Sequence, residues 1–221
     1  MFQRVRRLAA VGTLSIAVAG LFALTASPAN AASATPQIQL PPSTTAAISQ
    51  VSTQGPGGPL DEFVELQNVS ASPLDISGWT VFSCSASGAL TRLATVLPGT
   101  VLEPATPTQG AEVGSFYLLA NVAQYSRGTI PDQTMTGNIL NNGGVLLRNA
   151  QGVRIDSVGF SANNQCTQSV PAPQQTTFAD QSDIRVSNTG VNGIDFRLIT
   201  PAFPRNSSFT TAASTAIRVA A

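Results

Sequence analysis

The chain has 221 residues, of which 43% are hydrophobic and only 10% are charged, with 11 basic and 11 acidic side chains. Every basic residue is an arginine, which excludes histidine- or lysine-dependent catalysis and imidazole metal sites. A formal net charge of zero provides no basic footprint for nucleic acid, whereas the hydrophobic content is sufficient for a packed core.

The first thirty residues have the pattern of a secretory signal peptide. Residues 1–7 carry three arginines and no acid, and an apolar run from Leu8 to Ala26 follows. Pro28 ends the apolar run and is followed by Ala-Asn-Ala at 29–31. A signal peptidase requires small residues at such positions. A permanent membrane anchor is the alternative, because the run approaches the length of a bilayer span. We expect cleavage near Ala31, a location outside the cell or in the cell envelope, and no membrane span afterwards.

The expected mature chain consists of one domain between two tails. After Ala31 it has 8 arginines against 11 acids, a net charge of −3, which disfavours a nucleic-acid partner. Residues 32–46 are rich in Ala, Pro, Ser and Thr and predict a flexible leader. Residues 207–221 predict a flexible tail. Residues 47–206 contain no internal repeat and predict a single domain.

The pattern of the domain predicts an all-β fold. Short apolar stretches alternate with Gly, Pro and Asn breaks, and none sustains the apolar stripe of a helix. Their spacing is typical of an antiparallel β-sandwich. Residues 149–152 predict a hairpin turn, and residues 104–114 and 161–181 predict long loops. The expected strands are Ala47–Thr53, Glu62–Asn68, Trp79–Cys84, Thr91–Thr95, Ser115–Ala120, Gly144–Arg148, Val153–Phe160 and Asp195–Leu198.

The two cysteines, Cys84 and Cys166, predict a disulfide in an oxidising compartment. We expect this bond to hold the 161–181 loop to the strand after Trp79 and to stabilise the fold by about 4 kcal/mol. Two buried free thiols are the alternative. The spacing is not that of a Cys-x-x-Cys motif, so redox catalysis is not indicated.

An acidic cluster is formed by Asp61, Glu62 and Glu65. Such carboxylates could bind Ca²⁺ or act as a pair in glycoside cleavage. Glu62 and Glu65 are three residues apart and point to opposite faces of a strand, which argues against joint action on one atom. We therefore interpret the cluster as solvated charge that keeps a sheet edge soluble. A calcium site is the weaker alternative, and we expect no catalytic residue and no cofactor.

The later arginines have two interpretations. They could form a small anion-binding patch, but we expect them to pair with nearby acids. The arginines are Arg148, Arg154, Arg185 and Arg197, and the acids are Asp156, Asp183 and Asp195.

Several segments in order resemble the lamin tail domain family. Ile48–Val51 and Asp61–Asn68 (DEFVELQN) resemble the first two strands, and Leu74–Val81 (LDISGWTV) resembles the family's D-l-S-G-W motif. Residues 143–159 resemble its later hairpin. The segments D-F at 195–196 and TPAFPRN at 200–206 resemble its closing motif. The resemblance covers roughly residues 47–206. It departs from the family at 202–203, where Ala-Phe replaces Gly-Ala, and at the insert around 104–114.

This resemblance implies an immunoglobulin-like sandwich that binds or tethers rather than catalyses, as in secreted bacterial members. The motif residues also have expected structural roles of their own: Gly78 lets Trp79 turn inward to anchor the core, and Asp75 or Ser77 fixes a corner. We expect a secreted module for an unknown protein or glycan partner at the cell surface. The alternatives are a calcium-stiffened surface structural protein and an extracellular carboxylate hydrolase.

Overall fold

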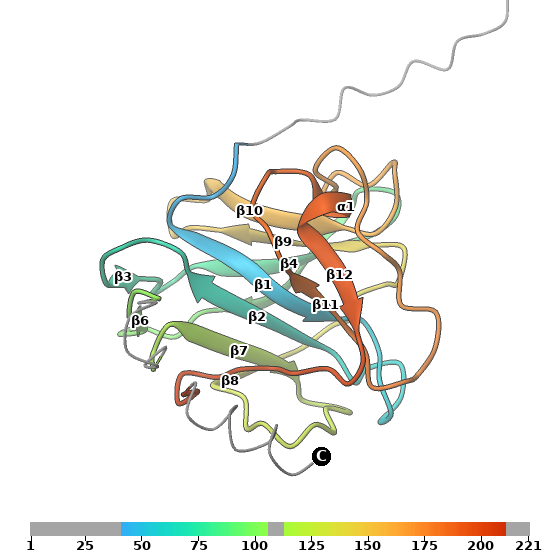
Figure 1. Ribbon diagram of the computed structural model, residues 1–221, viewed down its shortest axis with the longest axis horizontal. Coiled ribbons are helices and arrows are strands. Elements are labelled where there is room, and N and C mark those ends of the chain that lie inside the picture. Colours follow the sequence, from blue (N-terminus) through green and yellow to red (C-terminus); the bar gives the residue numbers. More distant parts are fainter. Residues whose placement is uncertain (1–40, 106–112, 211–221) are drawn as a thin grey trace, which may run out of the picture. The chain divides into compact units, whose positions relative to one another are not determined.

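The computed structural model describes residues 41–105 and 113–210, which are almost entirely β-structure (Figure 1). The expected signal peptide, most of the leader, residues 106–112 of the first long loop and the end of the tail lie outside this part. The single helix here, α1 (Asn192–Asp195), has one turn. The strands are β1 (Ala46–Ser52), β2 (Phe63–Asn68), β3 (Leu74–Asp75), β4 (Thr80–Cys84), β5 (Leu90–Thr95), β6 (Val101–Leu102), β7 (Phe116–Asn121), β8 (Gln133–Met135), β9 (Gly144–Arg148), β10 (Arg154–Gly159), β11 (Ser182–Arg185) and β12 (Phe196–Ile199).

The described strands form two main sheets. One has six strands in the order β12-β11-β1-β2-β7-β8, and the other has four in the order β10-β9-β4-β5. β3 and β6 form a small separate pair. Every strand pair is antiparallel except β7 and β8, which are parallel. The prediction of an all-β antiparallel sandwich is therefore confirmed, with one parallel pair at the edge of the larger sheet.

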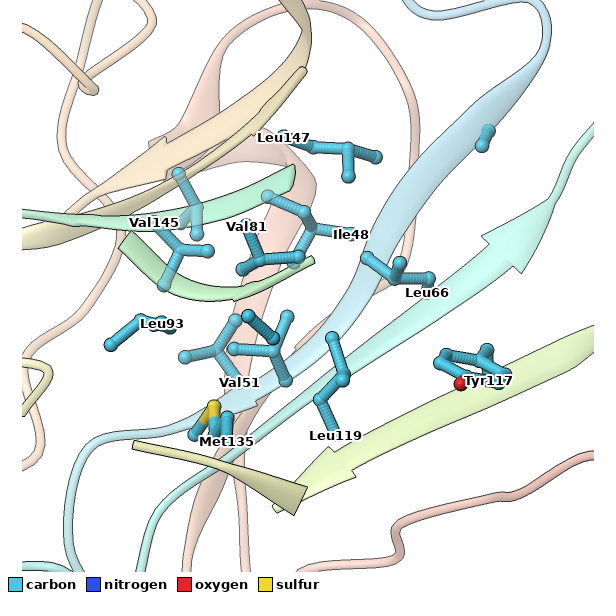
Figure 2. Close-up of a cluster of buried hydrophobic side chains, with 14 of the residues drawn as sticks. Ile48, Val51, Leu66, Val81, Leu93, Tyr117, Leu119, Met135, Val145 and Leu147 are labelled. Atoms are coloured by element: carbon cyan, nitrogen blue, oxygen red, sulfur yellow. The ribbon is translucent and has the colours of Figure 1, made fainter. Parts of the chain in front are cut away.

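The main core lies between the two sheets, as Figure 2 shows. Strand alternation directs one apolar set from each sheet inward, and each fully buried side chain contributes about 1.5–3 kcal/mol. Trp79 belongs to this core and is only 7% exposed, directly after Gly78 with its φ of 73°. Core residues of the six-stranded sheet include Ile48, Val51, Leu66 and Leu119, and those of the four-stranded sheet include Val81, Leu93, Val145 and Leu147.

The corner before Trp79 is fixed by two short polar side chains, as the sequence predicts. The Ser77 N–H donates to Asp75 Oδ1 at 2.8 Å. Ser77 Oγ then accepts from the Gly99 N–H at 2.9 Å and the Thr100 N–H at 3.2 Å. These bonds join the β3–β4 corner to the β5–β6 turn, and they use backbone donors that a tight turn would otherwise leave without partners.

The predicted disulfide is present between Cys84, at the end of β4, and Cys166. Residues 161–181 contain no strand, so the bond joins a long loop to the four-stranded sheet, as expected. The loop also packs closely on β10, since a Cβ added to Gly159 would lie 2.0 Å from Thr167 Oγ1. Ala172 from the same loop is buried in the main core. The loop is therefore part of the folded domain.

Strand boundaries differ from the predictions where strands are short or polar. Four short strands have no counterpart among the expected ones, because they have only two to four residues and no sustained alternation: β3, β6, β8 and β11. The last strand begins at Phe196 rather than Asp195. Asp195 instead ends α1, where its carboxylate accepts from the N–H groups of Thr189 and Gly190 at 2.8 and 3.0 Å. These contacts explain why an acidic residue lies at this junction.

Candidate functional site

The acidic cluster does not form a solvated edge, so that interpretation is wrong. Asp61, Glu62 and Glu65 are each 0% exposed. β2 lies inside the six-stranded sheet between β1 and β7, and later segments cover its outer face. The three carboxylates have different partners. The residues 41–105 and 113–210 contain no group of three or more acidic or cysteine side chains that could hold a metal ion.

Asp61 forms a buried ion pair with Arg127, with Arg127 Nη1 at 2.6 Å from Asp61 Oδ1. The same carboxylate accepts from the Gly57 N–H at 2.8 Å and from Ser126 Oγ at 2.5 Å. These bonds fasten the β1–β2 loop to the segment that follows β7. A Cβ at Gly55 would lie 2.6 Å from Arg127 Nη2, so a larger residue there would displace the ion pair.

The guanidinium donors of Arg127 are already used in hydrogen bonds within the protein. Its Nε donates to Asp180 Oδ1 at 3.2 Å, and its Nη2 donates to Ser52 Oγ at 2.8 Å. Nη2 also reaches the carbonyl oxygens of Gln54 and Gln181 at 3.3 Å. The side chain is 6% exposed. An arginine so enclosed by protein acceptors joins segments of the chain rather than recognising an anion.

Glu65 forms the second buried ion pair, with Arg205. Arg205 Nη2 lies 2.7 Å from Glu65 Oε1, and the Arg205 N–H donates to Oε2 at 2.5 Å. Ser49 Oγ also donates to Oε1, at 2.6 Å. Burial raises the pKa of Glu65, whereas the charge of Arg205 and these hydrogen bonds lower it. The guanidinium of Arg205 also stacks 3.9 Å from the centroid of the Phe116 ring.

Arg205 belongs to a segment, residues 200–209, that crosses the outer face of the six-stranded sheet and is called the strap here. Gln50 Nε2 donates to the Phe203 carbonyl at 2.9 Å, and the Phe203 N–H donates to Gln50 Oε1 at 3.1 Å. Further along, Ser207 Oγ donates to Asp132 Oδ1 at 2.5 Å. The strap is thus held by side chains of β1, β2 and the segment before β8.

Glu62 points away from the strap. Its Oε1 accepts from the Ile139 N–H at 2.6 Å, and its Oε2 accepts from Asn121 Nδ2 at 2.9 Å. Burial raises the pKa of Glu62 from 4.5 to about 7, and the two hydrogen bonds partly oppose this rise. Glu62 and Glu65 therefore cannot act on one atom, as the strand geometry predicts.

The later arginines contribute one further buried ion-pair cluster. Arg185 Nη2 lies 2.6 Å from Asp156 Oδ2, and its Nη1 lies 3.3 Å from Asp195 Oδ2. This confirms pairing for Arg185. Asp183 differs from the expectation, because both of its carboxylate oxygens are buried and neither has a hydrogen-bond partner in the described part. Desolvation raises the pKa of Asp183 from 3.8 to about 8.

A surface cavity lies beside the strap and is called the strap pocket here. Its volume is about 400 Å³. Phe203 remains 39% exposed, and Ile130, next to the lining residue Thr129, is 78% exposed. Asp180 contributes the carboxylate that pairs with Arg127. The pocket thus combines apolar flanks with hydroxyl and backbone groups. Its lining comprises Pro56, Ser126, Arg127, Gly128, Thr129, Asp180, Ala202, Phe203 and Pro204.

Sequence reasoning missed both Arg127 and Arg205 as partners of the acidic cluster. Asp61 and Arg127 are 66 residues apart, and Glu65 and Arg205 are 140 apart, so no local spacing connects them. Arg205 stands within the closing motif, which was the one available signal. The Ser-Arg-Gly sequence around Arg127 carries no pattern that would identify it.

No protein-family model matches the sequence, and no curated protein matches it as a relative. Among the residues described, none of the helical structure is long and apolar enough to cross a membrane.

Proposed function

We propose that this protein is a secreted, non-catalytic binding or tethering module with a lamin-tail-like domain, whose partner docks at the strap pocket. The observation that carries the proposal is the pocket itself. It exposes apolar side chains that the core does not use, on a strap fixed by the buried Glu65–Arg205 pair. A rigid backbone with exposed apolar anchors is what a protein interface needs, because little ordering entropy is lost on binding.

The residues that carry the family resemblance support this proposal through their structural roles. Glu65 of the early motif binds Arg205 of the closing motif. Asn68 donates to the Leu102 carbonyl at 3.0 Å and accepts from the Ser70 N–H at 2.9 Å. Asp75 fixes the corner before Trp79. Motif residues that hold the scaffold leave the exposed Phe203, where the chain departs from the closing motif, as a candidate contact for a partner.

The partner that best fits the strap pocket is a protein with an apolar anchor side chain. Phe203 and Ile130 provide exposed apolar surface, and the arginine in the lining is already neutralised by Asp61 and Asp180. A strongly charged ligand would therefore find no unpaired counter-charge in the lining. An uncharged segment with one buried side chain would find apolar contact surrounded by hydroxyl and carbonyl groups.

Affinity capture tests the proposal. The chain from residue 32 onward, immobilised as bait, is incubated with envelope and culture-medium fractions, and bound proteins are identified by mass spectrometry. We expect a partner at near-stoichiometric yield on the unaltered bait and its loss on Phe203→Ala, because truncation of an anchor removes the central apolar contact.

The matched control is Val153→Ala, which truncates another exposed apolar side chain, in the β9–β10 turn. It should capture the partner as well as the unaltered bait does. Thermal melting of each bait establishes that it is folded. Equal capture by Phe203→Ala and Val153→Ala, or no partner on any folded bait, would contradict docking at the strap pocket.

A further inference from the structure

Two cavities that share lining residues lie beside the segment 138–142 and are together called the uncharged groove here. Their volumes are about 270 and 230 Å³, and both are lined by Asn138 and Leu140. No lining residue is charged, and no residue is shared with the strap pocket. The lining consists of Thr53, Gln54, Pro59, Ser83, Cys84, Ser85, Thr91, Asn138, Ile139, Leu140, Asn141, Asn142 and Gln174.

The rim of this groove, residues 138–142, is held rigidly from below. Ile139 is fully buried, and its N–H donates to Glu62 at 2.6 Å. Asn141 accepts from Thr53 Oγ1 at 2.7 Å and donates to Gln54 Oε1 at 3.1 Å. The buried Glu62 carboxylate therefore positions the rim, a role that the acidic cluster in the sequence did not suggest. A pre-ordered rim reduces the entropy lost when a ligand binds.

The rim presents amide groups that the fold does not use. Asn138 and Asn142 are exposed, and their side chains make no hydrogen bond to the described part of the chain. Gln174 donates through Nε2 to the Phe160 carbonyl, which leaves its Oε1 available. Each primary amide offers both donors and an acceptor. Exposed Leu140 and Pro59 add apolar surface among these polar groups.

From this lining we infer that the groove is a binding site for a neutral oligosaccharide. Sugar hydroxyls both donate and accept hydrogen bonds, so they complement amide and hydroxyl side chains, and the C–H face of a sugar ring can pack on Leu140. A charged ligand would lose hydration without meeting an opposite charge. A peptide cannot add a strand at β4, because β9 and β5 already flank it, and the edge strand β5 contributes only Thr91 to the groove.

This site goes beyond the proposed function, since it lies outside the strap pocket and takes a different class of ligand. The test uses the chain from residue 32 onward, labelled with ¹⁵N, and four neutral hexasaccharides of glucose or mannose. An oligogalacturonate serves as the charged probe, and an uncharged extended peptide as the peptide probe. We expect one neutral sugar to shift the side-chain amide signals of Asn138, Asn142 and Gln174, whereas the charged and peptide probes leave them unchanged.

Variants make the assignment specific. Asn138→Ala combined with Asn142→Ala should weaken sugar binding about tenfold or more, because each lost pair of hydrogen bonds removes about 1 kcal/mol. Gln151→Ala removes an exposed amide in the turn at the opposite end of β9 and should leave the affinity unchanged. The inference is overturned if no neutral sugar shifts these signals up to about 10 mM. It is equally overturned if the peptide or charged probe shifts them instead, or if Gln151→Ala weakens binding as much as the double variant.

Discussion

Two regions of the six-stranded sheet treat a buried carboxylate in opposite ways. Beneath the strap, Glu65 receives hydrogen bonds from Ser49 and from both the backbone and the guanidinium of Arg205. In β11, Asp183 receives none from the described residues. Both side chains are 0% exposed. The difference shows that the hydrogen-bond donors around a buried carboxylate, and not burial alone, determine its role in this fold.

Burial raises the pKa of both groups, but at Glu65 the positive charge of Arg205 and three kinds of donor oppose the rise. At Asp183 desolvation acts without opposition, so its pKa of about 8 leaves it protonated at pH 7. Glu65 holds the strap through an ion pair, whereas Asp183 is a neutral acid whose burial lowers the stability of the fold as pH rises.

Glu65→Ala is the change with the largest expected effect. It leaves Arg205 without its carboxylate partner and removes the main attachment of the strap, so we expect a loss of about 3–5 kcal/mol in the free energy of unfolding. Urea denaturation followed by tryptophan fluorescence of Trp79 measures it. Glu103→Ala, at an exposed glutamate, is the control and should change stability by less than about 0.5 kcal/mol. A loss of similar size in both variants would contradict a specific contribution of the Glu65–Arg205 pair to the free energy of unfolding.

Asp183→Asn tests the opposite region. The folded pKa of about 8 lies above the usual 3.8, so the unfolded chain releases its proton first as pH rises. The native protein therefore loses stability between about pH 4 and pH 8. The variant has no proton to release, so we expect its stability relative to the parent to rise from about pH 4 to pH 8, and its advantage at pH 8 to reach at least about 3 kcal/mol. Denaturation midpoints across this range measure the difference.

The control for this prediction is Asp180→Asn, in which the side chain is 39% exposed and already paired with Arg127. It should show no gain at pH 8. If Asp183→Asn is destabilised at every pH, the carboxylate has a bonding role that contradicts its description as unpartnered.

These regions also show what the sequence could reveal. Alternation in residues 62–68 places Val64 and Leu66 on one face, and both lie in the main core. The same alternation placed Glu65 and Phe63 on the other face, but it could not show that this face is also covered. The strap that covers it begins more than 130 residues later, and its cover depends on contacts between distant segments. Local periodicity carries no information about such contacts.

The candidate sites were less predictable for a related reason. The cysteine count and the expectation of an oxidising compartment were enough to predict the Cys84–Cys166 bond, because only one pairing exists. The uncharged groove has no such signature. Asparagines at 138, 141 and 142 are typical of a loop, and they become a site only when β4, β5 and the β1–β2 loop place their own polar side chains opposite them. That placement is a property of the tertiary fold.

Arg205→Lys tests how much the shape of the guanidinium group contributes to the Glu65 ion pair. The ammonium group keeps the charge but cannot reproduce the contacts of Arg205 Nη2 and Nε with Glu65 or its stacking over Phe116 at 3.9 Å. We expect a loss of about 1–2 kcal/mol, smaller than that of Glu65→Ala, measured by urea denaturation. Arg92→Lys, at an exposed arginine of β5, is the control and should have no measurable effect. A loss as large as that of Glu65→Ala would mean that geometry rather than charge holds the strap.

Glu62 lies between the two extremes, with two donors and no cation. Its pKa of about 7 stands above the usual 4.5, so the folded protein keeps this proton after the unfolded chain has lost it. Stability should therefore decline between about pH 4.5 and pH 7, and Glu62→Gln should remove that part of the decline.

In Glu62→Gln, the amide oxygen can still accept from the Ile139 N–H, but the NH₂ group faces the donating Asn121 side chain. We expect Glu62→Gln to be less stable than the parent by about 1 kcal/mol at pH 4.5, and to become the more stable of the two by pH 8, because the parent loses about 1.4 kcal/mol per pH unit between about pH 4.5 and pH 7. Denaturation midpoints at the two pH values measure it. A deficit that widens with pH would show that the ionised carboxylate stabilises the rim, and Glu62 would then belong with Glu65 rather than between Glu65 and Asp183.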